Sequence, residues 1–405
     1  MIDRLKRMLD MRRGKRVRRF LLTLYRDFSL QGRDYRGCAD LVVHPGQGPG
    51  ELKALVGRGL EAAALVRNEP FPLPEPGAGA LELPQSRLAS GTLESWLLPL
   101  TEALFREDRC QEGGLNTGEL FLSRVRTRVL NSQGVDATYT APQVFLEFIS
   151  EWRGREEFEL YRSLSFADFQ PDWIARSVRE QLLASRDRAS ASPTPRLKAL
   201  PVLLSGEPVS LFLRYYLERA SAQMVYQKLS TARLGCSLQG EKVSGDTLTL
   251  RLVPFLPNSP HSSPCDEDGF PLRETVVAEE GILRRYLGPL HFTHYLGVEP
   301  TGDLKNMIVL PGGTPAQELR GEDCLEVVSF SDFQYDGITG DFGGEIRLAY
   351  CRRGGRRFPV SGGSISGTVR EVEGSCRFSR ETRSQGGFSG PETIRLLNVR
   401  ISGAQ

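Results

Sequence analysis

Histidine is scarce in this sequence, and its scarcity limits every kind of site that depends on imidazole. The 405 residues include only four histidines: His44, His261, His291 and His294. A zinc site needs three or four converging histidine, cysteine or carboxylate ligands. His291 and His294 are three residues apart but have no third ligand near them, and we expect them on a short helix after a strand over 282–287. His261 and Cys265 lie in a loop rich in proline and serine, so neither pair predicts a metal site.

Long apolar runs and paired cysteines are also missing. No stretch approaches the ~18 apolar residues that a membrane-spanning helix needs. No apolar segment with a cleavage site follows the basic N-terminus, so a secretory signal is not expected. The seven cysteines are odd in number and scattered, and no two of them form a C-x-x-C pair. We therefore expect free thiols in a reducing cytoplasm and no membrane attachment.

Several common catalytic motifs are absent. The sequence contains no G-x-S-x-G nucleophile motif, and its glycine pairs precede neither a Lys-Ser pair nor a helix, which excludes a phosphate loop. The adjacent acids Asp266, Glu267 and Asp268 repel one another, and we expect them in a solvated loop. A Cys/His nucleophile pair stays open, because nothing in the sequence selects one of the thiols. Composition and motifs together indicate no active site in this chain.

Charge is nearly balanced over the whole chain but not along it. Lysine and arginine number 52 against 50 aspartates and glutamates, which excludes a polycation that coats nucleic acid. Residues 1–20 hold nine basic and two acidic side chains, so the remainder is net negative. Such an arm can contact nucleic acid or anionic lipid. A solvated terminus is the interpretation that we favour.

The length and the glycine distribution predict two domains. The small-residue, proline-containing stretch over 189–195 is the predicted boundary, and glycines number 16 before it and 26 after it. Residues 1–195 are predicted to form an α+β domain with a mixed or antiparallel sheet, which begins with strands over 16–27 and 35–43 and a helix over 50–66. Residues 196–405 are predicted to form a mainly antiparallel, glycine-rich β domain, barrel-like or sandwich-like. Its hairpins pair 274–278 with 282–287 and 345–350 with 357–360, and its one long helix covers 209–229.

Several spaced motifs in the second half point to a known family. They are CDEDGFPLRETVVAEEGILRRYLG (265–288), NMIVLPGG (306–313), GITGDFG (337–343) and RETRSQGGFSGPETIRLLNVRISGAQ (380–405). In these motifs the chain resembles the TldD/TldE family, also called PmbA or "modulator of DNA gyrase" proteins. The resemblance covers most of the chain and is strongest from about residue 195 onward.

The resemblance also implies which kind of family member this is. TldD-type members resemble zinc metallopeptidases, in which a helix carries HExxxH and a later cysteine completes the metal site. Here the corresponding helical stretch reads Leu211, Phe212, Leu213, Arg214, Tyr215 and Tyr216, and the place of the cysteine reads Gly386-Gly387-Phe388. The resemblance therefore implies a TldE-like chain with no catalytic residue, no metal ligand and no cofactor of its own, with zinc in a TldD-like partner.

Three functional hypotheses follow from these observations. The first is a non-catalytic subunit of a cytoplasmic TldD/TldE-type zinc metallopeptidase heterodimer, which helps to form a chamber for unfolded or leader peptides. In it, glycine-rich sheet edges within 337–369 would pair with an extended peptide through backbone hydrogen bonds. The second is a stand-alone peptide-binding or scaffolding homodimer without peptidase activity. The third is a nucleic-acid modulator that uses the basic arm; the net negative remainder of the chain disfavours it.

Overall fold

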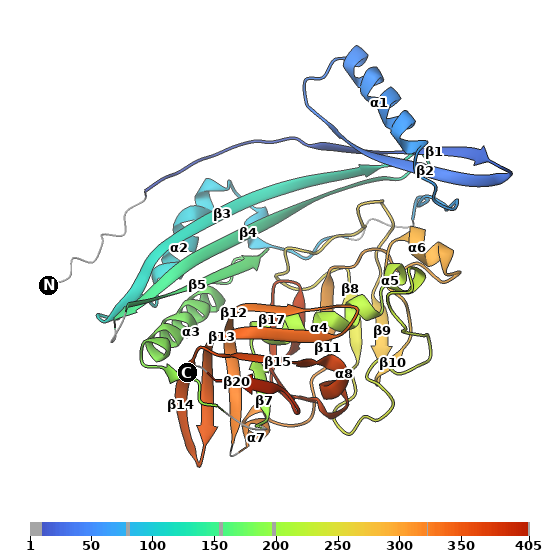
Figure 1. Cartoon of the computed structure of the whole chain (residues 1–405). Helices are drawn as coiled ribbons and strands as arrows, with labels where there is room; N and C mark the ends of the chain where they lie inside the picture. The colour runs from blue at the N-terminus through green and yellow to red at the C-terminus, as the bar shows by residue number, and fades with distance from the viewer. Residues whose placement is uncertain (1–9, 78–81, 154–156, 197–199, 322, 404–405) are drawn as a thin grey trace. The chain divides into compact units, whose positions relative to one another are not determined.

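The computed structural model describes residues 10–77, 82–153, 157–196, 200–321 and 323–403. The chain divides into two compact units, Met1–Pro72 and Leu73–Gln405 (Figure 1). Residues 1–9, which carry part of the predicted basic arm, lie outside the described residues. The boundary between these units differs from the domain boundary predicted at residue 195. The predicted domain boundary stays a prediction.

The first unit is a β-hairpin with one helix packed on it. The strands β1 (Phe20–Leu30) and β2 (Arg33–Val43) pair along their whole length, and α1 (Pro49–Ala63) follows them. Gln31 and Gly32 form the turn with φ of 53° and 76°, the left-handed conformation that tight hairpin turns use. Gly59 lets α1 approach closely, because a Cβ there would lie 2.7 Å from side-chain atoms of both Leu24 and Leu41. The predicted strand pair and helix are confirmed.

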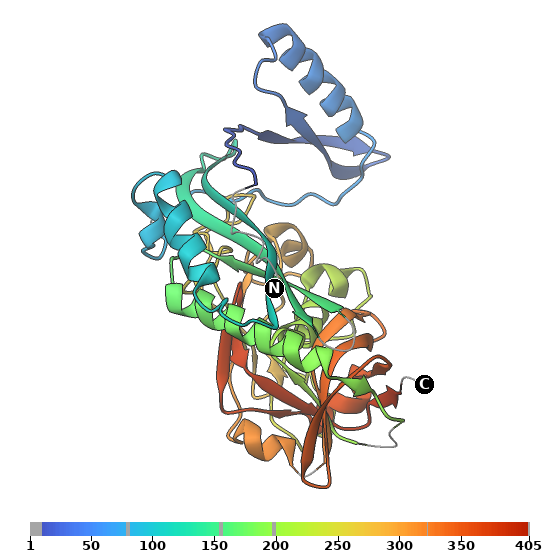
Figure 2. The ribbon, with the colours of Figure 1, turned by 90° about the vertical axis from the view of Figure 1, so that its left-hand side faces the viewer.

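The second unit begins with a three-stranded antiparallel sheet that two helices cover on one face. Its elements are η1 (Arg87–Ala89), η2 (Glu94–Trp96), α2 (Leu97–Phe105), β3 (Gly113–Leu130), β4 (Asp136–Arg153), β5 (Glu157–Phe166) and α3 (Pro171–Ala189). Helices α2 and α3 lie side by side and bury Leu146, Phe148 and Leu164 of the sheet (Figure 2). Side chains alternate along a strand, so Phe121 and Phe145 point to the opposite face, where they are exposed.

Two larger sheets make up the rest of this unit. The six-stranded sheet, in the order β10-β9-β8-β11-β18-β17, contains β8 (Leu250–Val253), β9 (Thr275–Glu279), β10 (Ile282–Leu283), β11 (Asn306–Val309), β17 (Thr382–Gln385) and β18 (Phe388–Pro391). The nine-stranded sheet contains β6 (Ser192–Pro193), β7 (Val202–Ser205), β12 (Cys324–Tyr335), β13 (Asp341–Arg353), β14 (Arg356–Ser361), β15 (Ser364–Thr368), β16 (Arg377–Phe378), β19 (Thr393–Leu396) and β20 (Arg400–Ser402). Both sheets contribute to one hydrophobic core. Both predicted hairpins are present, as β9–β10 and β13–β14.

The helices between these strands are short. They are α4 (Glu207–Arg219), α5 (Ala222–Tyr226), α6 (Leu290–Tyr295), α7 (Ala316–Arg320), α8 (Val369–Val372) and η3 (Glu373–Ser375). Within the described ranges, no helix is both long enough and apolar enough to cross a membrane. The predicted α+β class is confirmed, and most strand pairs are antiparallel as expected. The pairs β11–β18, β12–β7 and β14–β6 are parallel.

The predicted long helix over 209–229 is wrong, because the chain breaks it into α4 and α5. Ser221 has an extended backbone (ψ 125°), and its hydroxyl caps α5 by accepting a hydrogen bond from the Met224 N–H. The backbone of Leu287 forms two hydrogen bonds at the break. Its N–H donates to the Ala220 carbonyl, and its carbonyl accepts from the Ala222 N–H. These bonds replace those of a continuous helix, and nothing in local helical spacing reveals them.

Segments before and after residue 195 contact each other, which explains why they belong to one compact unit. Helix α3 packs against β13 and β14. The Tyr350 hydroxyl donates to Asp187 Oδ2 at 2.7 Å, and Arg383 Nη2 lies 2.9 Å from Glu180 Oε2. Arg347 Nη2 donates to the carbonyl of Glu159 at 2.8 Å. The three-stranded layer and the two larger sheets therefore share direct polar and packing contacts.

Candidate functional site

Helix α4 carries the six residues, Leu211–Tyr216, that the family resemblance predicts at the place of the zinc-binding motif of TldD-type chains. It begins at Glu207, directly after β7, where Gly206 makes the turn with φ of 77°. Phe212, Leu213, Tyr215 and Tyr216 are buried, Leu211 is half-buried and Arg214 is exposed. Since a helix turns about 100° per residue, α4 has one face in the core and one face in solvent. The candidate residues are thus divided between two environments.

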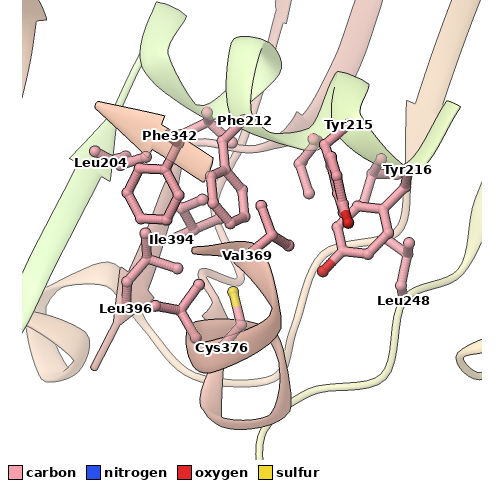
Figure 3. Packing of buried hydrophobic residues seen from close by; sticks show 14 of the residues in the cluster. Leu204, Phe212, Tyr215, Tyr216, Leu248, Phe342, Val369, Cys376, Ile394 and Leu396 are labelled. Atoms are coloured by element: carbon pink, nitrogen blue, oxygen red, sulfur yellow. The ribbon is translucent and has the colours of Figure 1, made fainter. Parts of the chain in front are cut away.

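Aromatic rings fill the volume beneath the buried face of α4 (Figure 3). Phe212 packs edge-on against Phe342 of β13, with ring centroids 5.5 Å apart. Tyr215 packs at 5.5 Å against Tyr216 and at 6.4 Å against Tyr335 of β12. All four α4 residues on this face belong to the main hydrophobic core. This face of the helix is therefore closed to a substrate.

Two glycines of the motif GITGDFG, Gly337 and Gly340, lie against side chains of α4. A Cβ at Gly337 would lie 1.8 Å from Glu218 Oε2, and one at Gly340 would lie 2.9 Å from the Tyr215 hydroxyl oxygen. Gly340 also has φ of 82°, a conformation that favours glycine. Glu218 Oε1 accepts a hydrogen bond of 2.7 Å from the Tyr335 hydroxyl. The sequence marked this motif but did not show that it seats the helix.

A buried polar group lies at the C-terminal end of the same face. The Tyr216 hydroxyl donates to Glu373 Oε2 at 3.5 Å, and Arg219 Nη1 lies 3.9 Å from the same oxygen. Burial raises the pKa of Glu373 to about 7, against the opposing effects of Arg219 and Tyr216. Burial also raises the pKa of the Tyr216 hydroxyl and of the Cys376 thiol. Sequence reasoning missed Glu373, because no motif links it to α4.

These residues do not fit a zinc ion. Zinc takes thiolate, imidazole or carboxylate donors, whereas the six α4 positions supply aliphatic, aromatic and guanidinium side chains. Glu373 is occupied by Tyr216 and Arg219, and the raised pKa of Cys376 disfavours its thiolate. Across the residues with described positions, no three His, Cys, Asp or Glu side chains gather as a metal site would require.

The two histidines of α6 and the carboxylate of Asp266 are held in place by local contacts. His291 and His294 lie on α6, the short helix expected there, and the His291 ring stacks on Phe292 with centroids 4.5 Å apart. The expectation that Asp266 is solvated is wrong, because its side chain is buried. Its carboxylate accepts backbone N–H bonds from Asp268, Phe270 and Asp303 at 3.1, 2.8 and 3.3 Å. Burial raises the pKa of Asp266 to about 6 in spite of these bonds.

Part of the glycine-rich segment 337–369, where we expected free sheet edges, is paired on both sides, whereas Arg356–Pro359 of β14 pair with β13 alone. The residues 342–345 of β13 pair with β12 on one side and with β15 on the other. Ser364–Ser366 of β15 pairs with β13 and with β20. Because these backbone groups are already paired, an extended peptide cannot add there without displacing a strand. The three-stranded sheet differs, since β3 and β5 are its edge strands.

Comparison with known proteins identifies the family of the chain. A family model described as the PmbA/TldA metallopeptidase C-terminal domain matches residues 198–403. The chain belongs to the PmbA/TldD family. The expected family is confirmed, and the matched region contains α4, its aromatic core and the GITGDFG motif.

Individual PmbA/TldD relatives are distant in sequence. The chain is 23% identical over 284 residues to the uncharacterized protein MJ0231 of Methanocaldococcus jannaschii, which covers 66% of this chain and 65% of that protein. It is 25% identical over 214 residues to Metalloprotease PmbA of Escherichia coli O157:H7, which covers 51% and 46% of the two chains. These matches span between about half and two thirds of the relatives' lengths.

A solved structure extends the likeness over nearly the whole fold. TldE from Thermococcus kodakarensis superposes with a TM-score of 0.73, at 17% identity and with 95% of each chain covered. This coverage includes most of the part of the chain before residue 198, which the family model does not match. The likeness confirms the fold of the PmbA/TldD chain.

Proposed function

We propose that this chain is a non-catalytic, TldE-like subunit of a cytoplasmic TldD/TldE-type zinc metallopeptidase heterodimer. One observation carries the proposal: the buried face of α4 presents Phe212, Tyr215 and Tyr216 to a filled aromatic core instead of presenting metal ligands to a cavity. Zinc and catalysis then belong to the TldD-like partner. This chain helps to form the chamber around the partner's site.

The three-stranded sheet supports a role in holding unfolded or leader peptides. The face opposite α2 and α3 exposes Phe121, Phe145 and Tyr161, and the first two rings lie 6.0 Å apart. Exposed aromatic side chains provide apolar contact area at a low cost in conformational entropy. The edges of β3 and β5 offer backbone groups to an extended chain, a mode of binding that tolerates many sequences.

The alternative is a peptide-binding or scaffolding homodimer without a peptidase partner. The same exposed aromatic face would serve this assembly as well, because it can bind a peptide in a homodimer or in a heterodimer. The two assemblies differ in composition and in activity, so one set of measurements separates them.

The test is to purify the chain alone and together with a TldD-type chain. Light scattering gives the assembly, elemental analysis gives the zinc per chain, and a fluorogenic unstructured peptide reports cleavage. The proposal expects a mixed dimer whose cleavage depends on the partner. A stable homodimer that ignores the partner supports the alternative. Stoichiometric zinc together with cleavage by the isolated chain contradicts both.

A further inference from the structure

The face of the three-stranded sheet opposite α2 and α3 carries an aromatic pair next to an acidic pair. In the register of β3 and β4, Phe121 lies directly opposite Phe145, with ring centroids 6.0 Å apart. Two positions earlier on β3, Glu119 lies directly opposite Glu147. Side chains alternate along a strand, so all four point to the same face. We call these four residues the acidic–aromatic patch.

Strand β5 continues this pattern on the other side of β4. Tyr161 lies opposite Ile149, and its hydroxyl donates to Glu147 Oε2 at 2.7 Å. Glu151 lies directly opposite Glu159 and forms a second acidic pair. Directly opposed residues of an antiparallel sheet have Cβ atoms about 5 Å apart, and like charges there destabilise the sheet. The two glutamate pairs therefore work against the stability of the sheet.

The hydrogen-bond donors that reach these glutamates within the chain are neutral. Glu147 accepts from the Tyr161 hydroxyl, and Glu159 Oε1 accepts from the Asn116 amide at 2.7 Å. Among the residues that the structure describes, none of the four glutamates makes an ion pair. The arginines of β3 alternate onto the face that the helices cover; they are Arg124, Arg126 and Arg128.

Two other arginines lie at the far end of the face, beside the Glu151–Glu159 pair. Arg347 Nη2 donates to the Glu159 carbonyl at 2.8 Å, and Arg153 follows Glu151 by two positions on β4. The acidic–aromatic patch lies beyond Tyr161 along the strands, and neither arginine forms an ion pair with its carboxylates. The patch therefore keeps its negative charge.

The patch is accessible from the edge of the sheet. Phe121 is 50% exposed and Phe145 is 37% exposed, while Glu119 is exposed and Glu147 is half-buried. Because β3 is an edge strand, an extended peptide that pairs with it places alternate side chains on the face of the patch. A side chain opposite Glu119 then has a carboxylate beside it and an aromatic ring within diagonal reach.

A lysine or arginine side chain complements both halves of the patch. Its cationic group meets two carboxylates, and its methylene stem covers apolar ring surface. The faces of the two rings attract the cation as well. An acidic side chain would be repelled there, and a neutral one would gain apolar contact alone. Charge complementarity therefore selects a basic occupant.

We propose that the acidic–aromatic patch binds a lysine or arginine side chain of an extended peptide that lies along β3. The inference rests on the proposed peptide-holding role and adds the charge class of the peptide that is held.

The test is fluorescence anisotropy of three short labelled peptides with the full chain. The peptides share a sequence of serine and valine and differ at one central position, which is lysine, glutamine or glutamate. The lysine peptide is expected to bind about tenfold more tightly than the glutamine peptide, the effect of one charge-assisted contact of ordinary strength. The glutamate peptide is expected to bind most weakly. Added salt should reduce the preference for lysine, because it screens exposed charges.

Variants decide whether the patch is responsible. Glu119→Gln combined with Glu147→Gln removes both charges and is expected to abolish the preference for lysine. Glu61→Gln combined with Glu102→Gln makes the same change at exposed positions on α1 and α2 and is the matched control, expected to keep the preference. Since the first variant relieves repulsion between opposed carboxylates, its Tm should stay the same or rise.

Three results overturn the subsite. They are equal affinity for the lysine and glutamine peptides, a preference for lysine that survives in the patch variant, and no binding of any peptide. Light scattering of the same samples tests for a second copy of the chain on the patch. A dimer that only the patch variant dissociates, with no preference for lysine, overturns the proposal as well. Zinc content and partner-dependent cleavage are measured separately, so failure of the subsite is distinguishable from failure of the proposed function.

Discussion

The two faces of α4 differ in nearly every property, although they are only one residue apart in the sequence. Phe212, Tyr215 and Tyr216 are buried among rings from β12 and β13, whereas Arg214 is exposed to solvent. The core face stabilises the fold, and the solvent face carries charge. The difference teaches that six consecutive residues of one helix can stabilise the core with one side and face solvent with the other.

The largest expected effect comes from opening the core face. Phe212→Ala removes a fully buried ring that packs against Phe342, so the free energy of unfolding should fall by about 3–5 kcal/mol. Urea unfolding followed by circular dichroism measures the loss. Leu211→Ala on the half-buried boundary is the control, with an expected loss of about 1 kcal/mol. Equal losses in the two variants would contradict the division of α4 into two faces.

The next effect concerns Glu373, the carboxyl group at the end of the core face. Its pKa is raised from 4.5 to about 7 in the folded chain, so folding favours its protonated form. Its contribution to stability is therefore present below about pH 4.5 and is lost as the pH rises through 7, an effect of about 3 kcal/mol.

Glu373→Gln tests that pH dependence and keeps an acceptor for the Tyr216 hydroxyl. Unfolding midpoints between pH 4.5 and 8 should fall less steeply in the variant than in the wild type. The pKa of Asp266, raised to about 6, acts in the same direction and leaves a residual slope in both proteins. Identical slopes would show that Glu373 does not titrate as its burial implies.

A smaller effect is expected where the GITGDFG motif seats the helix. Gly340→Ala places a Cβ on a residue with positive φ and brings it against the Tyr215 hydroxyl. The free energy of unfolding should fall by about 2 kcal/mol. Gly354→Ala shares the positive φ but meets nothing within 4 Å, so it should cost only about 1 kcal/mol. The difference between the two losses in unfolding free energy measures the contact with Tyr215. Equal losses in the two variants would contradict the claim that the motif stabilises the position of α4.

The smallest effect on stability belongs to the solvent face. Arg214→Gln should change the free energy of unfolding by less than about 0.5 kcal/mol, because the side chain is exposed and makes no ion pair within the described ranges. Calorimetry of the wild type and the variant measures it. A loss as large as that of Phe212→Ala would assign Arg214 to the core face of α4.

The sequence predicted the fold best where the information is local or carried by several spaced motifs. Alternating side chains and glycine turns identified both hairpins of the second half, and the motifs identified the family. The break between α4 and α5 escaped prediction, because it depends on hydrogen bonds to Leu287, far along the chain. Asp266 was misplaced in solvent for a similar reason: one of its backbone donors belongs to Asp303.

The candidate site was predictable only in part. The motif comparison selected the six positions on α4, but it did not show which side chains face the core. Glu373 meets Tyr216 and Arg219 at the end of α4, although 157 residues separate it from Tyr216. No spacing rule in the sequence encodes this meeting, because the tertiary fold brings the two segments together.

The most direct test of a non-catalytic subunit is a titration of a zinc-loaded TldD-type chain with this one, followed by peptide cleavage and by zinc analysis of each chain. The account predicts no cleavage by this chain alone, a rate that rises to a plateau at one chain per partner, and zinc confined to the partner. Cleavage by this chain alone, with one zinc ion bound to it and no response to the partner, would contradict the account.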